Sequence, residues 1–485
     1  MLESLPMVVL AATAGMMALV TFGALRWIGL RPAAAFLLLA YLPFQNILLP
    51  VLLRVGGVAA MAPLLPAKEI LAIVGILESL RPAFANYRLR VADVLAVVFA
   101  TFLIVNAAFS PADLTSVGHG LRDFSVPLLM YLLGRVAWYG GTANTPRLMR
   151  LVLIMGVIVA VLGLVDYGLA FLNLSPFDAL QAGYFDVAYG HGAPAAAHQS
   201  EGFMGVSTLT GQFGNNLITA TYLRFTLCTL LAYLSYSAQK ARRVHLIILA
   251  LLVVASIFTF SRYGLAFLLV LGVTLLGASR SFLRWQKILT AVVLLAVIGT
   301  SAPTLARIAT TTAAVGDQST YTHMESLREL KNIDVSIMGN GLGTGAHSSQ
   351  ARLIYRDSEG EGILRQDIPE IGVLGVGLLL AFATVVIGGL TRNATLGLPT
   401  RRWHYVWIAV PLLAEVIVAP FDIGLRSFLG TGSAWFLCGW FLSEGPSVPN
   451  QTRRPFRSAR IHGRSREGAS SKPRAEQIAD ILQNA

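Results

Sequence analysis

Arg262 is a charged residue in a position where a lipid bilayer would exclude charge. Apolar residues 246–260 precede it and apolar residues 265–277 follow it, with Ser261 and Gly264 close by. A guanidinium at membrane depth is costly and marks a functional site by default. It can bind phosphate oxygens through two parallel hydrogen bonds, and small neighbours let a ligand approach the backbone. We therefore predict a catalytic anion clamp at Arg262, with Ser261 in the binding site. The alternative is an interfacial arginine that reaches to lipid headgroups.

Three further arginines are candidates for contact with the same anion. Arg224 lies inside an apolar segment, so we expect it to face the interior of a helix bundle rather than lipid. Arg122 enters another apolar segment at the end predicted to face outward. Arg328 stands in a helical-looking stretch between two glutamates, and a surface ion pair is its alternative interpretation. Arginines that converge from separate segments suit a pyrophosphate. We assign Arg328 to catalysis and the other two to substrate binding.

A glycine-rich run and a histidine lie in the long polar segment 303–370. The run 339–345 lacks the Gly-Lys-Ser/Thr ending of a Walker loop, and it precedes no βαβ unit. We assign Gly341 and Gly343 to substrate binding, with a flexible turn as the alternative. His347 is also assigned to substrate binding, with a polar loop residue as the alternative. No metal is expected, because the histidines lack metal-ligand spacing.

Carboxylates complete this polar segment. Asp357 and Glu361 come first, and Asp367 and Glu370 follow. Such residues usually form a solvated loop face. A carboxylate that meets the arginine cluster could instead accept a proton from a sugar hydroxyl. On that basis Glu361 is assigned a catalytic role, with Asp357 as the alternative carboxylate. A site of arginines alone, without a dedicated base, is equally compatible with the pattern.

The elements that must position these residues are membrane helices. Hydrophobic residues make up 55% of the chain, charged residues 13%, and the mean hydropathy is +0.66. Apolar runs close to the roughly 20 residues that span a bilayer recur along the chain. We predict an all-α, polytopic transmembrane helical bundle of about 12–14 spans. The predicted spans are residues 7–25, 33–53, 64–80, 91–109, 121–136, 151–171, 216–236, 245–260, 263–277, 288–302, 371–387, 405–419 and 428–441.

Charge in the connecting loops predicts the orientation. With 13 spans most basic residues fall on one side, which gives an outside N-terminus and a cytoplasmic C-terminus. The net charge of +12 is thus orientation charge, and no nucleic-acid partner is expected. Two long loops, 172–215 and 303–370, then face outward from a membrane domain of residues 1–449. We expect residues 450–485 to form a basic, disordered cytoplasmic tail that binds anionic membrane lipid.

The order of these features resembles the O-antigen ligase/polymerase superfamily of bacterial envelope glycosyltransferases. The resemblance rests on Thr259-Phe-Ser-Arg262-Tyr-Gly, on the glycine run in a long outward loop, and on Glu370-Ile-Gly-Val-Leu-Gly375 at the next span. It covers residues 205–387 in order and spacing. Ligase-like members carry His-Asn about nine residues before the Glu-x-Gly, whereas this chain has Glu361-Gly362 there. This departure favours a polymerase.

The resemblance implies an enzyme of the cytoplasmic (inner) membrane whose active site faces the periplasm. Its substrate would be an oligosaccharide linked to undecaprenyl pyrophosphate, with Arg262 holding the pyrophosphate. No cofactor is expected, and a flippase and a chain-length regulator are expected partners. We therefore expect a polymerase of O-antigen or exopolysaccharide. The alternatives are a ligase that transfers finished glycan to lipid A core or protein, and a polysaccharide transporter or flippase without chemistry.

Overall fold

The computed structural model describes the chain in separate stretches, and every regular element in them is helical. The prediction of an all-α fold is confirmed for this part of the chain, which contains no strand. The described residues are 33–61, 67–84, 87–138, 144–170, 209, 216–237, 243–259, 261, 267, 271, 336–344, 363–397, 402–419 and 424–444. Three predicted spans (7–25, 263–277 and 288–302), almost all of the loop 172–215 and the tail 450–485 lie outside them, apart from residues 209, 267 and 271.

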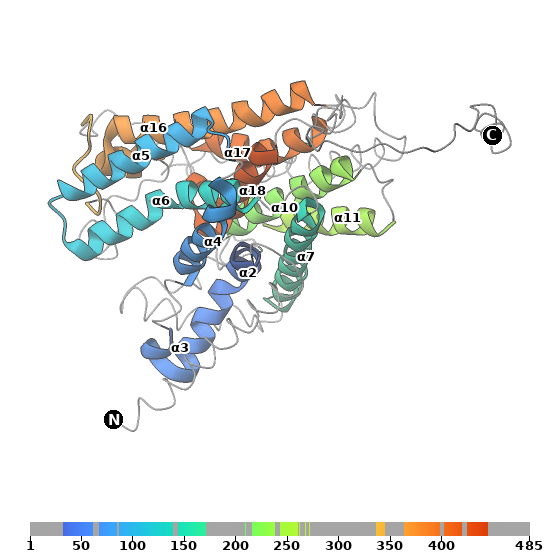
Figure 1. Cartoon of the computed structure of the whole chain (residues 1–485). Helices are drawn as coiled ribbons and strands as arrows, with labels where there is room; N and C mark the ends of the chain where they lie inside the picture. Colours follow the sequence, from blue (N-terminus) through green and yellow to red (C-terminus); the bar gives the residue numbers. More distant parts are fainter. Residues whose placement is uncertain are drawn as a thin grey trace, which may run out of the picture. The chain divides into compact units, whose positions relative to one another are not determined.

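The helices belong to one compact unit that ends at Ser447 (Figure 1). They are α2 (Ala33–Tyr41), η1 (Leu42–Phe44), α3 (Gln45–Met61), α4 (Ala67–Phe84), α5 (Val91–Ala108), α6 (Leu114–Ala137), α7 (Thr145–Ala170), α10 (Asn216–Tyr236), α11 (Arg243–Phe258), α16 (Ile363–Leu396), α17 (Arg402–Val418), η9 (Gly424–Arg426) and α18 (Phe428–Glu444).

Four of these helices are long and apolar enough to cross a membrane, namely α5, α7, α10 and α16. A fifth span is formed if α2 and η1 are counted together with Ile47–Leu53 of α3. Two shorter helices, α11 and α17, are also apolar. Because runs of this length and hydropathy are stable in a bilayer, the chain is a membrane protein with transmembrane helices.

Two predicted boundaries differ from the structure for a local reason. The predicted span 33–53 has the bounds of the pair Ala33–Phe44 and Ile47–Leu53, but the pair is bent by 69° close to Pro43, which has no amide hydrogen to donate. Helix α6 starts at Leu114 rather than 121, because the carboxylate of Asp113 accepts hydrogen bonds from the amides of Thr115 and Ser116. Helix α16 starts at Ile363, so the predicted loop 303–370 ends eight residues too late.

The N-cap of α6 also changes the titration of its carboxyl group. Hydrogen bonds from the hydroxyl and amide of Ser116 hold the pKa of Asp113 below its usual value. Since the cap fixes the start of α6, Arg122 lies in the third turn of the helix and not at its entrance.

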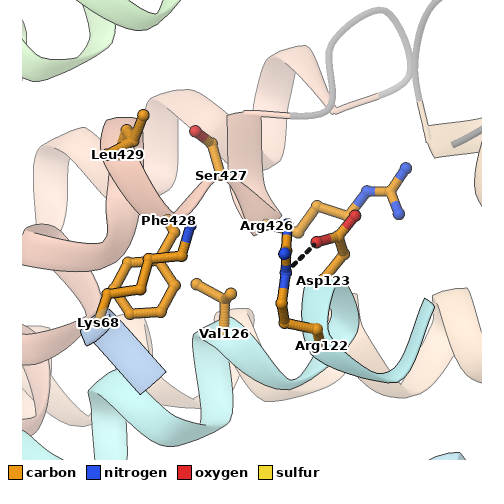
Figure 2. Close-up of a pocket in the computed structure, with 8 residues that line it drawn as sticks. All are labelled: Lys68, Arg122, Asp123, Val126, Arg426, Ser427, Phe428 and Leu429. Carbon is orange, nitrogen blue, oxygen red and sulfur yellow. Dashed lines mark hydrogen bonds and ion pairs between the residues drawn. The ribbon is translucent and has the colours of Figure 1, made fainter. Parts of the chain in front are cut away.

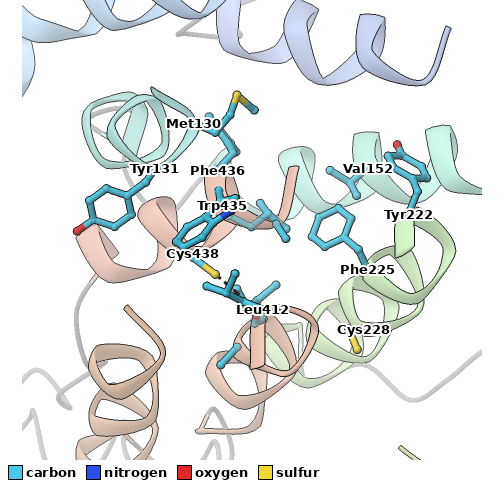
Figure 3. Close-up of a cluster of buried hydrophobic side chains, with 14 of the residues drawn as sticks. Met130, Tyr131, Val152, Tyr222, Phe225, Cys228, Leu412, Trp435, Phe436 and Cys438 are labelled. Atoms are coloured by element: carbon cyan, nitrogen blue, oxygen red, sulfur yellow. Dashed lines mark hydrogen bonds between the residues drawn. The ribbon is translucent and has the colours of Figure 1, made fainter. Parts of the chain in front are cut away.

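Close packing of α6 against α18 forms the centre of the unit. A Cβ atom on Gly134 would meet the carbonyl of Phe436, and one on Gly439 would meet the carbonyl of Tyr131. Glycine at both positions therefore lets the two backbones touch, as is common between membrane helices. Around this contact lie buried side chains from several helices (Figure 3), and the ring of Trp435 stacks on Phe382 of α16 at 5.1 Å.

Candidate functional site

Buried charges collect at two ends of the described unit. The first, termed the Arg426 end, joins η9 and the N-terminal parts of α4, α6 and α16. The second, termed the Arg135 end, joins the N-terminal part of α5 to the C-terminal parts of α6 and α18. Arg88, Arg90 and Arg150, which the charge pattern assigns to one side of the membrane, all lie toward the Arg135 end.

A pocket of about 190 Å³ opens at the Arg426 end (Figure 2). Its polar lining consists of three cations, one carboxylate and one hydroxyl, and its apolar lining of three side chains. They are Lys68 from α4, Arg122, Asp123 and Val126 from α6, Arg426 from η9, and Ser427, Phe428 and Leu429 from the start of α18. Cations from three separate elements thus line one small cavity.

Arg426 is the most deeply buried of the three cations in this pocket. It is only 5% exposed, and its guanidinium lies 4.6 Å from the centre of the Phe124 ring. One terminal nitrogen is 2.8 Å from Oδ1 of Asp367, which is fully buried. The distance is that of a hydrogen bond but the alignment is not, so Nε and this nitrogen make no hydrogen bond to the described residues. A buried donor without an acceptor costs about 1–3 kcal/mol, which an incoming anion would recover.

Lys68 is a second buried cation with little compensation. Its ammonium lies 4.0 Å from Glu69 and 5.2 Å from the centre of the Phe428 ring. The ring supplies a cation–π contact, and the carboxylate is at the limit of an ion pair. An ammonium has three donors, so Lys68 retains capacity for an anionic ligand.

Arg122, a predicted binding residue, does lie in this pocket. Its Nε is 3.3 Å from Asp123 and 3.6 Å from Glu69, and its side chain is 41% exposed. Ion pairs this exposed are weak, so the guanidinium can exchange a carboxylate for a ligand at low cost.

Arg224, the other predicted arginine among the described residues, is not part of the pocket lining. It is 2% exposed within α10, which confirms that it faces the bundle and not lipid. It donates hydrogen bonds to the carbonyl of Ala220 and, at 2.5 Å, to the hydroxyl of Thr221. It also pairs with Glu415 of α17 at 3.3 Å. Arg224 therefore joins two helices inside the unit.

Ser261 is buried just beyond the end of α11 and does not line the pocket. Its amide faces the hydroxyl of Thr259 at 3.5 Å. Arg262, Arg328, Glu361 and His347 lie outside the described residues, so their assignments stay predictions.

Gly341 and Gly343 belong to a segment, Ser336–Thr344, that fills a break in α16. At Gly372 the helix adopts φ 69°, which releases two amides and two carbonyls from their helical partners. The amides of Val373 and Leu374 donate to the carbonyls of residues 336 and 337, at 3.2 and 3.1 Å. The amides of residues 340 and 341 donate to the carbonyls of Pro369 and Glu370, at 2.7 and 3.1 Å. All four released groups are thereby satisfied.

The glycines of this segment are required by its close contacts. Gly339, Gly341 and Gly343 all have positive φ, at 77°, 107° and 83°. A Cβ atom on Gly343 would meet the backbone of Ser116 in α6. The amide of Gly343 donates to Oε1 of Glu370 at 2.6 Å, and Ser110 donates to the carbonyl of Leu342 at 2.6 Å. The described part of the run, residues 339–344, is therefore held in place by contacts with α6 and α16.

The interpretation of Asp367 and Glu370 as a solvated loop face is wrong. Both are buried, one against Arg426 and the other against the amide of Gly343. Arg426, Lys68, Asp367 and Glu370 were not assigned to the site by sequence. A signal existed for Arg426, because it breaks the charge pattern as an arginine in a short loop predicted to face outward.

The Arg135 end contains a comparable pair with different surroundings. Arg135 contacts both oxygens of Asp93, at 2.9 and 2.8 Å, and donates to Ser443 and to the carbonyl of Arg88. Tyr131 donates to the same carboxylate at 2.8 Å. Nearby, burial raises the pKa of Tyr87 to about 12. The described residues thus satisfy the donors and acceptors of this pair, as is typical of a structural connection.

No protein-family model matches this chain, and a search of curated proteins found none similar to it. The assignment of function therefore rests on the geometry of the pocket and on the sequence pattern.

Proposed function

We propose that this protein is a membrane glycosyltransferase, and specifically a bacterial surface-polysaccharide polymerase. It would join repeat units carried on undecaprenyl pyrophosphate at the outer face of the cytoplasmic membrane. The observation that carries the proposal is the pocket at the Arg426 end, where three cations from separate elements converge and the most buried one lacks hydrogen-bond acceptors. The predicted orientation of the chain puts this end outside the cytoplasm.

The chemistry of a pyrophosphate fits this lining. Guanidinium groups bind phosphate oxygens with directional, charge-assisted hydrogen bonds, and lysine adds a mobile point charge. Arg122, Arg426 and Lys68 together offer more donors than their protein partners use. Asp123 is the single carboxylate in the lining, so the pocket carries a net positive formal charge.

The proposed reaction is a displacement at the anomeric carbon of the donor sugar. A hydroxyl oxygen of the acceptor sugar forms the new bond to that carbon, and the bond from the carbon to the pyrophosphate oxygen breaks. Negative charge develops on the leaving pyrophosphate. Preorganised cations stabilise such charge in the transition state, which is the contribution expected from Arg426 and from Arg262.

Purified protein in liposomes, supplied with a synthetic undecaprenyl-pyrophosphate repeat unit, tests the proposal. The expected result is a ladder of polymer lengths on a gel, lost in Arg262→Ala at unchanged protein level. Normal long polymer in that variant would refute the role of Arg262.

Other outcomes would identify the rival functions. A single transfer that needs added lipid A core or acceptor protein would indicate a ligase. Movement of the lipid-linked unit across the bilayer without a new glycosidic bond would indicate a transporter. Either result would overturn the polymerase.

A further inference from the structure

The proposed transfer needs an acceptor for the proton of the attacking hydroxyl. At the Arg426 end four described carboxylates lie close enough to be considered. They are Glu69, Asp123, Asp367 and Glu370. Their contacts differ, and the differences select one of them.

Asp367 and Glu370 are engaged inside the protein. Asp367 is fully buried against Arg426, and Glu370 accepts the amide of Gly343 at 2.6 Å. Neither side chain lines the pocket. Their geometry suits support of the site, with Asp367 holding Arg426 and Glu370 holding the segment Ser336–Thr344.

Glu69 and Asp123 both pair with Nε of Arg122, at 3.6 and 3.3 Å. Only Asp123 lines the pocket, and its side chain is 34% exposed (Figure 2). Oδ1 of Asp123 accepts the hydrogen bond from Arg122, while Oδ2 accepts none from the described residues. One carboxylate oxygen is thus oriented by an arginine and the other can meet a hydroxyl.

We propose that Asp123, in place of the predicted Glu361, is the catalytic base of the transfer, an inference that rests on the proposed function. The acceptor hydroxyl gives its proton to Oδ2 of Asp123 as its oxygen bonds to the anomeric carbon. The electron pair of the broken carbon–oxygen bond leaves with the pyrophosphate, which Arg426, Lys68 and Arg122 hold. Base and leaving-group cations then share one pocket, and Arg122 contacts both.

Asp123→Asn separates this role from binding, with Glu69→Gln as the matched control. Both variants remove a carboxylate beside Arg122, but only the first removes a carboxylate of the pocket. Turnover in the liposome assay should fall about 10²–10⁴-fold in Asp123→Asn, as for the loss of a general base. In Glu69→Gln it should change by about fivefold or less, because Glu69 does not line the pocket and its ion-pair partner Arg122 is partly exposed.

Binding of inorganic pyrophosphate, measured by calorimetry on the detergent-solubilised protein, should move in the opposite direction. Losing a negative charge from a cationic pocket strengthens anion binding, so Asp123→Asn should bind pyrophosphate at least as tightly as the wild type. Rescue supplies the second readout, because formate should restore part of the turnover of Asp123→Ala and none of that of Arg426→Ala.

The outcomes separate the two proposals. If the wild type transfers no sugar, the proposed function fails. If the wild type is active and Asp123→Asn keeps its turnover, the polymerase stands and Asp123 is not the base. Equal losses of turnover and pyrophosphate binding in Asp123→Asn would reduce it to a structural residue and overturn the inference.

Discussion

Two buried arginine–aspartate pairs lie at opposite ends of the helical unit, and they differ in how completely the protein satisfies them. Arg135 meets both oxygens of Asp93 and also bonds to a hydroxyl and a carbonyl. Arg426 lies 2.8 Å from Asp367, but both oxygens of that carboxylate lack an aligned hydrogen bond from the described residues. The second pair adjoins the pocket at the Arg426 end.

The difference indicates that buried charge alone does not identify a site. A pair whose donors and acceptors are all used is a structural connection, however polar it is. In a pair with unused donors beside a cavity, the donors have lost their bonds to water without gaining others. A ligand that accepts hydrogen bonds from them offsets this cost. Arg224 lies between these cases, because it has three protein contacts and one terminal nitrogen without an acceptor among the described residues.

Neutralising the saturated pair should have the largest effect on stability. The double variant Asp93→Asn with Arg135→Gln loses several charge-assisted hydrogen bonds, each of about 1.5–3 kcal/mol. We expect the free energy of unfolding in detergent to fall by at least about 3 kcal/mol. Chemical unfolding followed by tryptophan fluorescence measures it. Polymer formed per folded molecule should stay near the wild-type value, and a selective loss of turnover would contradict the structural role.

The same neutral substitution at the other pair should give the reverse result. Asp367→Asn with Arg426→Gln removes a buried charge pair that has no aligned hydrogen bonds to lose. Removing both charges also removes the cost of their desolvation, so the unfolding free energy should change by about 1 kcal/mol or less. Turnover should fall about 10²–10³-fold, as when one donor to a developing anion is removed. A large loss of unfolding free energy together with retained turnover would contradict this prediction. It would make the Asp367–Arg426 pair structural rather than functional.

Local patterns in the sequence predicted most of the helices but not the contacts between them. The apolar run 216–236 became α10 with the same bounds, because hydropathy alone selects a membrane helix. Asp367 is buried against Arg426, which lies far along the chain in η9. Glu370 is buried against the amide of Gly343, which belongs to the segment Ser336–Thr344. Hydropathy treats such carboxylates as loop residues, since it cannot include a partner that the fold brings to them.

The glycine run is a second case in which the sequence did not predict a contact between distant segments. Its composition predicted a loop that is either flexible or in contact with substrate. Its conformation is fixed by the break at Gly372, whose released backbone groups match those of the segment Ser336–Thr344. Pro369 and Gly372 are a local signal of the break in α16. The sequence does not show that the segment Ser336–Thr344 bonds to the backbone groups that the break releases.

Substitution of a single glycine tests whether that segment supports the Arg426 end. Gly343→Ala places a Cβ atom against the backbone of α6 at a φ of 83°, so we expect a loss of about 1–3 kcal/mol in unfolding free energy. Gly377→Ala is the control, because a Cβ atom there meets nothing within 4 Å. It should be neutral or slightly stabilising, as expected for alanine in a helix. Equal unfolding free energies of the two variants would show that the close contact of Gly343 with α6 does not stabilise the protein.

The smallest expected effect is the stabilisation of the folded protein by bound pyrophosphate. Measured in variants of the two arginine–aspartate pairs, it compares the Arg426 end with the Arg135 end. At a pyrophosphate concentration ten times the dissociation constant, one site stabilises the folded state by about 1.4 kcal/mol. A rise of this size in the unfolding free energy is expected for the wild type and for Asp93→Asn with Arg135→Gln. It should be absent in Asp367→Asn with Arg426→Gln, because the guanidinium that lacks acceptors is gone. Equal protection of both double variants would place the anion elsewhere, and the unused donors of Arg426 would then need another explanation.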